Sequence, residues 1–226
     1  HETDEVLKSL TGLAYLERQE YDTAENYFLQ AIRLDNANAN SHSMLGDCYS
    51  RIGKLDKAKK YYKISLRLDP NNKSALNNLA ALNYFNGNID EAEILYKNSI
   101  KYNEDNHEAR YSLAQCQLAK SNYIEGWNNF ESRWFVTQFN SKKLKSNIPK
   151  FNLSMGKKNL LLWSEQGIGD QILFIRFITN LKPFVNNLFI NIDSRLHKII
   201  ERFYPKVKFL IKNEINKNNN INAQIS

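Results

Sequence analysis

One short segment of the sequence has the residue types of a ligand-binding turn. It follows the apolar run 159–164 and precedes a stretch with apolar residues at helical spacing, so we expect a strand, a glycine turn and a helix. Backbone N–H groups at a helix start can bind an anion, and open α/β sheets place their ligands at this end of a strand. The expected substrate or phosphate loop consists of Glu165, Gln166, Gly167 and Gly169, followed by Asp170.

Asp170 has two possible roles in this turn. Its carboxylate would repel a phosphate placed directly at the helix start, but it could accept a proton from a substrate hydroxyl. Alternatively, Asp170 only caps the helix and the glycines only permit a tight turn. The turn is an incomplete dinucleotide-binding fingerprint, because Ile172 occupies the place of the third glycine.

The segments that would position this turn alternate between expected strands and expected helices. Short apolar runs separated by helical patterns predict a βαβαβ arrangement with a parallel sheet. Because three strands leave much apolar surface uncovered, we expect the natural chain to continue beyond Ser226. The expected strands are 159–164, 187–193 and 206–211, the helices are 171–184 and 194–203, and 213–220 is a mobile loop before a possible further strand at 221–226.

The preceding part of the chain repeats itself every 34 residues, which is the period of the tetratricopeptide helix–turn–helix unit. Small residues in two columns suit close helix crossings, and the aromatic residues of a third column fill the space between successive units. The columns are Gly12, Gly46, Ala80 and Ala114; Ala24, Ala58, Ala92 and Gly126; and Phe28, Tyr62, Tyr96 and Phe130.

About four helix pairs follow from this period, enough to bury a continuous core. We expect Asp22, Asp56 and Asp90 to be N-caps, and Gly53 and Gly87 to form the turns within the pairs. The expected helices are 5–18 and 22–35, 39–52 and 56–69, 73–86 and 90–103, and 107–120 and 124–136.

The fourth unit departs from the pattern. Arg133 takes the place of the small residues Ala31, Ser65 and Ser99. A terminal repeat often changes because its outer face meets solvent or another domain. Two interpretations of its aromatic cluster stay open, contact with another domain or closure of the repeat core; the cluster comprises Trp127, Phe130, Trp134 and Phe135.

The sequence therefore predicts a mainly α protein, a tetratricopeptide α-solenoid followed by a partial α/β Rossmann-like domain. The expected division is a repeat array at 1–136, a basic linker at 137–156 and the partial α/β domain at 157–226. From Thr137 onward there are 15 Lys and Arg against 5 Asp and Glu, whereas the rest has 16 against 19. A basic half can attract nucleic acid, anionic lipid or phosphorylated small molecules, or it can simply be a solvated surface.

The composition gives no indication of a membrane span, a signal peptide, a disulfide or a metal site. No stretch has the roughly 20 apolar residues of a membrane span, and the acidic start His1–Glu5 does not resemble a signal peptide. Cys48 and Cys116 are two repeats apart, so we expect no disulfide and a cytoplasmic location. The four scattered histidines form no metal-site spacing, so no metal is expected.

The repeats also predict a binding groove for a protein or peptide. On the usual geometry of the unit its lining is mixed and polar, which suits an extended peptide. Ser9 and Leu13 stand where chaperone-tail-binding repeats have carboxylate-clamping residues. The expected lining consists of Ser43, Asp47, Arg51, Asn77, Tyr84, Tyr111 and Gln115.

Two strings resemble one family. Residues 125–134 read E-G-W-N-N-F-E-S-R-W, and residues 160–172 read L-L-L-W-S-E-Q-G-I-G-D-Q-I. Both strings resemble bacterial tetratricopeptide proteins that carry a glycosyltransferase-like domain of the two-Rossmann GT-B type, akin to heptosyltransferases. The resemblance extends over the whole chain, and the two strings are its specific part.

This resemblance implies that the present α/β segment would bind a sugar acceptor, with Asp170 as the general base. It implies a nucleotide-sugar donor bound mainly by a second half, so this chain alone would hold no cofactor and would not transfer sugar unaided. Glu165 and Gln166 match the family string without an assigned role.

Three functions compete at this point, and whether the chain is an enzyme stays open. The first is a repeat-guided glycosyltransferase that recruits a protein or carrier. The second is a non-enzymatic adaptor whose α/β segment is structural. The third, nucleic-acid binding, is disfavoured because the lysines are spread rather than interleaved with aromatic residues.

Overall fold

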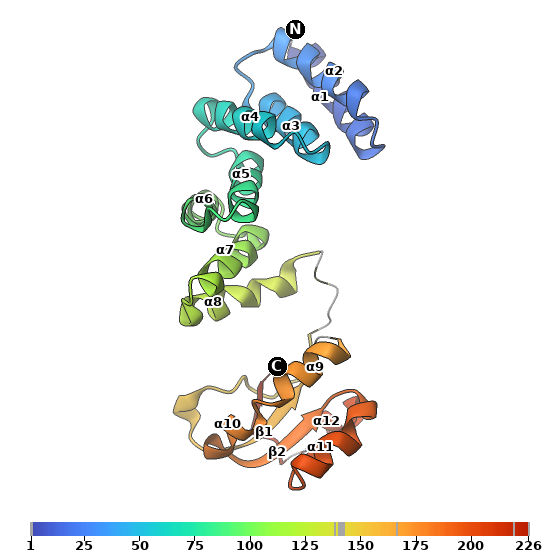
Figure 1. The fold of residues 1–226 in the computed structure, drawn as a ribbon, viewed down its shortest axis with the longest axis vertical. Helices are drawn as coiled ribbons and strands as arrows, with labels where there is room; N and C mark the ends of the chain where they lie inside the picture. The colour runs from blue at the N-terminus through green and yellow to red at the C-terminus, as the bar shows by residue number, and fades with distance from the viewer. Residues whose placement is uncertain (1, 138, 140–142, 166, 219, 226) are drawn as a thin grey trace. The chain divides into compact units, whose positions relative to one another are not determined.

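A computed structural model describes residues 2–137, 139, 143–165, 167–218 and 220–225. The chain divides into two compact units, unit 1 at 1–139 and unit 2 at 140–226. Figure 1 shows helical hairpins in unit 1 and strands with helices in unit 2.

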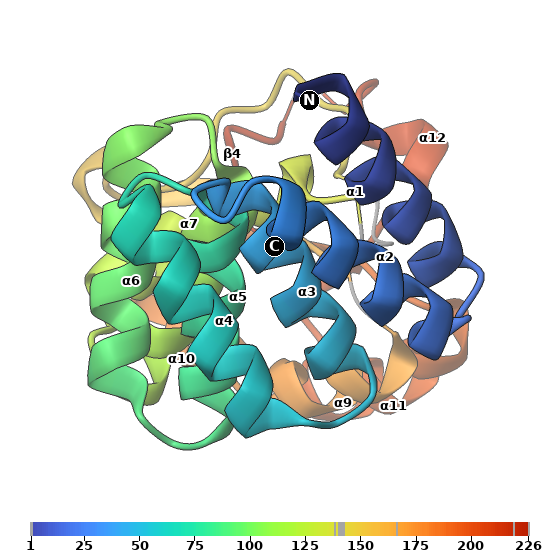
Figure 2. The same ribbon diagram turned by 90° about the horizontal axis from the view of Figure 1, so that it is seen from above.

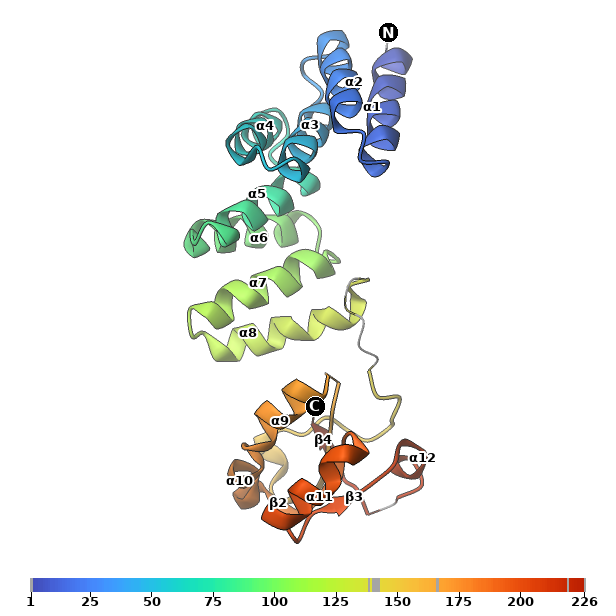
Figure 3. The same ribbon diagram turned by 45° about the vertical axis from the view of Figure 1, so that its right-hand side comes forward.

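Unit 1 is a series of four antiparallel helical hairpins. Successive hairpins are turned relative to one another, and α1 lies at the N-terminal end beside α2 (Figures 2 and 3). The tetratricopeptide α-solenoid predicted from the 34-residue period is confirmed. The elements are α1 (Glu2–Glu17), α2 (Tyr21–Leu34), α3 (Ala39–Arg51), α4 (Leu55–Leu68), α5 (Lys73–Phe85), α6 (Ile89–Tyr102), α7 (His107–Ala119), α8 (Tyr123–Phe130) and the 3-10 helix η1 (Glu131–Phe135).

The recurring columns lie at the helix crossings of each hairpin. A Cβ atom added to Gly46 would be 2.6 Å from Cε1 of Tyr62, and one added to Gly12 would be 2.7 Å from Cε1 of Phe28. The small side chain therefore lets the aromatic ring of the second helix lie directly against the backbone of the first. Ala24, like its counterparts in the second and third hairpins, is fully buried.

The predicted helix caps need a correction. Asp22, like its counterparts Asp56 and Asp90, lies inside the first turn of its helix, where a negative charge interacts favourably with the helix dipole, but it is not the N-cap. Asparagines cap the first helices instead. The side chain of Asn38 accepts hydrogen bonds from the N–H groups of Asn40 and Ser41, and Asn72 and Asn106 recur at the same position.

The last hairpin ends differently from the expected helix 124–136. The α-helix stops at Phe130 and continues as η1 because the buried Arg133 must be accommodated. Its guanidinium lies over the rings of Phe130 and Trp134, at 4.7 and 4.3 Å, and donates a hydrogen bond to Glu131. Of the predicted aromatic cluster, Phe130 and Trp134 thus pack within unit 1, whereas Trp127 and Phe135 are largely exposed.

Unit 2 contains a parallel sheet whose strands follow the order β3-β2-β1-β4 in the described residues. The expected helix 171–184 is three short pieces, and the expected loop 213–220 begins with a one-turn helix whose Ile215 is buried. The elements are η2 (Leu153–Met155), β1 (Lys158–Trp163), α9 (Ile168–Ile175), α10 (Ile178–Leu181), η3 (Lys182–Phe184), β2 (Val185–Asn191), η4 (Ser194–Leu196), α11 (His197–Phe203), β3 (Lys208–Phe209), α12 (Lys212–Ile215) and β4 (Ala223–Ile225).

Helices cover one face of this sheet. Leu160 and Ile190, from the central strands, pack against Ile178 of α10 and Ile200 of α11. Side chains alternate along a strand, so these residues define one face and their sequence neighbours the other. Part of the segment expected as a linker also belongs to unit 2, because the N–H of Phe151 donates to the carbonyl of Gln224 in β4.

Candidate functional site

The first helices of the hairpins share one face, which we call the first-helix face. It consists of the exposed and half-buried side chains of α1, α3, α5 and α7. Arg51 of α3 forms an ion pair of 2.8 Å with Glu17 of α1, and Asn78 of α5 donates a hydrogen bond to Asp47 of α3. Side chains of consecutive first helices therefore contact one another along the array.

Asp47, a predicted groove residue, is held by the fold. Its carboxylate accepts hydrogen bonds from the hydroxyl of Tyr62 (2.7 Å) and the amide of Asn78 (2.5 Å). Burial raises the pKa of Asp47, while Tyr62, Asn78 and Arg51 oppose that shift. Asp47 therefore ties a hairpin to its neighbour and offers little free acceptor capacity to a ligand.

Two further predicted residues lie inside the array. The side-chain oxygen of Asn77 accepts hydrogen bonds from Ser99 (2.7 Å) and Asn106 (3.3 Å). Ser43 is buried, and its hydroxyl has no hydrogen-bond partner within the described part of the chain. Neither side chain is placed to make a first contact with a partner.

The other four predicted residues lie nearer the surface. Arg51 is exposed, while Tyr84, Tyr111 and Gln115 are half-buried. Tyr111 lies 5.3 Å from the ring of Phe130 and 6.2 Å from that of Phe139, so the end of unit 1 contacts this part of the face.

Sequence reasoning missed the most accessible aromatic side chain of the face. Phe85 is 83% exposed and lies edge-on to Tyr84, with ring centroids 5.9 Å apart. It occupies the same repeat position as Arg51, one period earlier, and Glu17, two periods earlier. Stepping the Arg51 column forward by 34 would have identified it.

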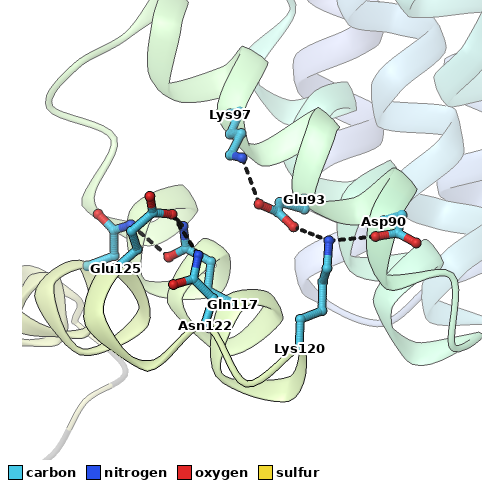
Figure 4. A network of polar contacts seen from close by, with 8 residues as sticks. Asp90, Glu93, Lys97, Gln117, Lys120, Asn122 and Glu125 are labelled. Carbon is cyan, nitrogen blue, oxygen red and sulfur yellow. Dashed lines mark hydrogen bonds and ion pairs between the residues drawn. The ribbon is translucent and has the colours of Figure 1, made fainter.

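A polar network joins the third and fourth hairpins (Figure 4). Lys120, at the end of α7, donates to Asp90 (2.6 Å) and Glu93 (2.8 Å) of α6, and Lys97 also pairs with Glu93 (2.7 Å). Hydrogen bonds from Lys120 and Lys97 lower the pKa of Glu93 despite its burial. This network links α6 of the third hairpin to the end of α7 in the fourth.

The glycine turn of unit 2 connects β1 to α9. Asp170 is exposed in the first turn of α9 and is not its N-cap; Gln166 lies outside the described residues. Gly169 does not have a positive φ, and a Cβ added to it would meet nothing within 4 Å. Neither its backbone conformation nor its packing therefore requires a glycine at this position. Glu165 is half-buried.

Three residues beside this turn were not singled out from the sequence. The side-chain oxygen of Gln171 accepts a hydrogen bond from the N–H of Asp193 (2.9 Å), which links the ends of β1 and β2. Arg195 pairs with Asp193 at 2.8 Å and, with its backbone N–H, lowers the pKa of Asp193 to about 2. The rule that ligands bind beyond the carboxyl ends of parallel strands could have identified all three.

Other kinds of site find no support in the described residues. They include no group of three or more His, Cys, Asp or Glu side chains that could hold a metal ion. No helix among them is long and apolar enough to cross a bilayer. Cys48 and Cys116 are unpaired, and burial raises the pKa of each thiol to about 11, so neither is a reactive thiolate.

Comparison with known proteins identifies the repeats. Models of the tetratricopeptide repeat match residues 10–38, 39–72 and 78–125. No curated protein matches the chain. Because the family-model matches end at residue 125, the heptosyltransferase-like resemblance of unit 2 rests on its sequence strings alone.

Solved structures share the fold of the array. The first TPR of Spaghetti (RPAP3), bound to the HSP90 peptide SRMEEVD, is 18% identical with a TM-score of 0.51, over 54% of this chain and 96% of that chain. MamA is 18% identical with a TM-score of 0.52, over 57% and 75%. A tetratricopeptide repeat protein from Parabacteroides merdae is 22% identical with a TM-score of 0.51, over 60% and 54%. Unit 1 is therefore an array of tetratricopeptide repeats.

Proposed function

We propose that this protein is an interaction scaffold whose unit 1 binds an extended peptide of a partner protein along the first-helix face. The observation that carries the proposal is Phe85, an aromatic side chain left 83% exposed on a face where neighbouring repeats present side chains to one another. Aromatic side chains dominate the energetics of many interfaces because they bury a large area with few rotatable bonds.

The peptide is bound by apolar contact and hydrogen bonds rather than by its terminal carboxylate. Ser9 and Leu13 provide no cation at the positions where a clamp would need one, and Arg51 is already paired with Glu17. The repeats of RPAP3, by contrast, are seen with the acidic peptide SRMEEVD. We therefore expect that peptide not to bind this chain.

Panning a displayed library of linear peptides on the full chain tests the proposal. Calorimetry would then compare the best peptide on the wild type, on Phe85→Ala and on Ile94→Ala, which removes an exposed apolar side chain from the second helix α6. We expect a loss of about tenfold for Phe85→Ala, equivalent to ~1.4 kcal/mol, and no change for Ile94→Ala. Peptides that bind equally well to both variants would contradict this site.

A second candidate, sugar-acceptor binding by unit 2 as part of a glycosyltransferase, is supported by the strand order. The order β3-β2-β1-β4 is that of the first four strands of doubly wound folds, whose ligands bind at the carboxyl ends where the order reverses. Asp170 lies beyond the end of β1, at that reversal. Its proposed role is to accept the proton of an acceptor hydroxyl.

Saturation-transfer NMR with a series of sugars and sugar nucleotides on the full chain tests this candidate. Signals that disappear in Asp170→Asn and persist in Glu201→Gln, an exposed carboxylate on α11, would support it. Absence of any signal, or equal signals in both variants, would contradict sugar-acceptor binding, and the interaction scaffold would be the only remaining proposal.

A further inference from the structure

Helix α4, in the second hairpin, carries a concentration of positive charge. It contains five Lys and Arg residues against one Asp, whereas the second helices α2 and α6 each contain one more acidic than basic residue. Figure 3 shows this hairpin between those of the first and third repeats. Both neighbouring hairpins are therefore in place, and they leave this charge exposed.

Four of the cations surround a hollow of about 660 Å³ in the surface. They occupy positions i, i+1, i+4 and i+8 of the helix, so they form a stripe along one side of it. Lys59 is half-buried, and the other three are exposed. We call Lys59, Lys60, Lys63 and Arg67 the α4 basic stripe; the residues that line the hollow are these four together with Asp56 and Leu66.

The repeats show that the fold does not require this charge. At the position of Lys59, the first and third hairpins have Glu25 and Glu93, and each of these carboxylates contacts the next hairpin. Glu25 accepts a hydrogen bond of 2.7 Å from the hydroxyl of Tyr49. Glu93 pairs with Lys120 at 2.8 Å. The ion pairs of the described residues, by contrast, include no cation of the α4 basic stripe.

Two of the charges in the stripe repel each other. In α6, Lys97 pairs at 2.7 Å with Glu93, four residues earlier. The same two positions of α4 hold Lys63 and Lys59, which are like charges at a spacing that brings them together on the helix surface. An anion bound between them would relieve this repulsion, so the stripe gains more from an anionic ligand than isolated lysines would.

The surroundings of the stripe favour a small ligand over a large polyanion. A membrane surface or a nucleic-acid duplex would also meet Asp22 of α2 and Asp90 of α6, the exposed equivalents of Asp56. The residues that line the hollow include no aromatic side chain on which a base could stack. A short anionic segment, however, can contact the stripe without reaching the acidic residues of the neighbouring helices.

The spacing of the cations indicates the conformation of such a segment. Residues four apart on a helix are separated by about 6 Å along its axis. Side chains two apart in an extended chain point to the same side and are separated by about 7 Å. Carboxylates at alternate residues of an extended peptide therefore match Lys59, Lys63 and Arg67.

We propose that the α4 basic stripe binds an extended acidic segment of a partner protein, with Asp or Glu at alternate residues. Successive carboxylates pair with the three cations that are four residues apart, and Lys60 lies beside them. The peptide SRMEEVD has only one pair of acidic side chains at this spacing, so it is a poor match. Because α4 is a second helix, this site is independent of the peptide site proposed on the first-helix face.

Calorimetry on the full chain at low salt tests the proposal with two peptides. The probe is an Asp-Ser repeat of about eight residues, all of whose Asp side chains lie on one side when it is extended. Its control has the same composition with the Asp residues consecutive, so that only half of them lie on one side. We expect the repeat peptide to bind more tightly than the control, and its affinity to fall as salt is added.

Two double variants with equal loss of charge then locate the site. Lys59→Gln with Lys63→Gln should weaken binding of the repeat peptide roughly fivefold to tenfold. The matched control removes Lys54 and Lys57, which lie 6.0 and 4.9 Å from the ring centroid of Tyr49, outside the hollow. Lys54→Gln with Lys57→Gln should weaken binding by about twofold at most. Phe85→Ala, on the first-helix face, should leave this binding unchanged.

Four results would overturn the proposal. The repeat peptide does not bind at low salt, or the two peptides bind equally well, or the two double variants lose the same affinity, which would mean that only net charge attracts the peptide. The fourth is tighter binding of a short DNA duplex, or of vesicles of equal parts phosphatidylserine and phosphatidylcholine, that Lys59→Gln with Lys63→Gln abolishes. The stripe would then serve a nucleic acid or a membrane.

Discussion

The two units differ in how often each contact occurs. In unit 1 the same helix crossing is built several times, so a residue such as Gly46 can be compared with Gly12, Ala80 and Ala114 at the same position. In unit 2 each element occurs once, and several are very short, such as β3 with two residues and α10 with four. The repeats therefore distinguish what the fold requires from what is left for a partner, whereas unit 2 offers no internal reference.

The sharpest contrast concerns the glycines of the two units. Gly46→Ala would place a Cβ 2.6 Å from the ring of Tyr62, whose hydroxyl is held by Asp47 and cannot move without losing that hydrogen bond. We expect a loss of about 1–3 kcal/mol in the free energy of unfolding. Gly169→Ala, with open space around it in α9, should be neutral or stabilising by up to ~1 kcal/mol.

Urea unfolding of the full chain, followed by far-UV circular dichroism, measures both changes. Ala80→Gly, which removes the methyl group at the same column of the third hairpin, is the matched control and should lose only about 1 kcal/mol. If Gly46→Ala were as stable as the wild type, the close approach of helix and ring would not explain why small residues recur at this position.

This contrast explains how far the sequence could predict the structure. The 34-residue columns located the helices of unit 1 to within one or two residues over most of its length, because every close crossing was repeated. The predicted N-caps were wrong because an aspartate such as Asp22 is favourable both as an N-cap and within the first turn of a helix. The sequence alone does not distinguish these two positions. The 3-10 segment was missed because burial of Arg133 among aromatic rings is a tertiary effect.

The candidate sites were harder to predict than the fold. Residue type suggested Asp47 and Asn77 for a groove, but both accept hydrogen bonds from their own hairpin and from the next one, and no single column of the repeat reveals these contacts. In unit 2 the motif located the turn between β1 and α9, while the link from Gln171 to Asp193 depends on which strands are neighbours. Polar residues could thus be listed from the sequence, but whether they serve the fold or a ligand depended on packing.

A second comparison concerns the turns within the hairpins. Gly53 and Gly87 have φ of 78° and 81°, and the same position is occupied by Gln19 and Ser121, with φ of 63° and 62°. A side chain in this left-handed region costs about 1 kcal/mol, part of which is recovered because glycine is more flexible when unfolded. We expect Ser121→Gly to raise the free energy of unfolding by roughly 0.5–1 kcal/mol, measured by urea unfolding. Gly53→Ser should lower it by a similar amount, and a change of equal sign in both variants would refute the explanation.

The smallest expected effects come from surface ion pairs, which again differ between the units. Lys120 joins two helices, α6 and α7, whereas Arg195 pairs with Asp193 two residues away in the same loop. Lys120→Met should therefore lower the free energy of unfolding slightly at neutral pH, and Arg195→Met should lower it less. The pKa of Glu93 lies below its ordinary value of 4.5 because Lys120 and Lys97 donate to it, so its contribution is present above pH 4.5 and lost as the pH falls through the lowered pKa.

Unfolding curves of Lys120→Met and wild type at several pH values and salt concentrations would test this pairing. The difference in stability between the two proteins should be largest near neutral pH and at low salt. It should decrease in acid, because Glu93 becomes protonated. It should also decrease at high salt, because the exposed ion pair of Lys120 with Asp90 is screened. Because Glu93 is nearly buried, its share should resist salt better than that of Asp90. A difference independent of pH would mean that Lys120 acts through the packing of its alkyl chain and that its ion pairs with Asp90 and Glu93 contribute nothing to stability.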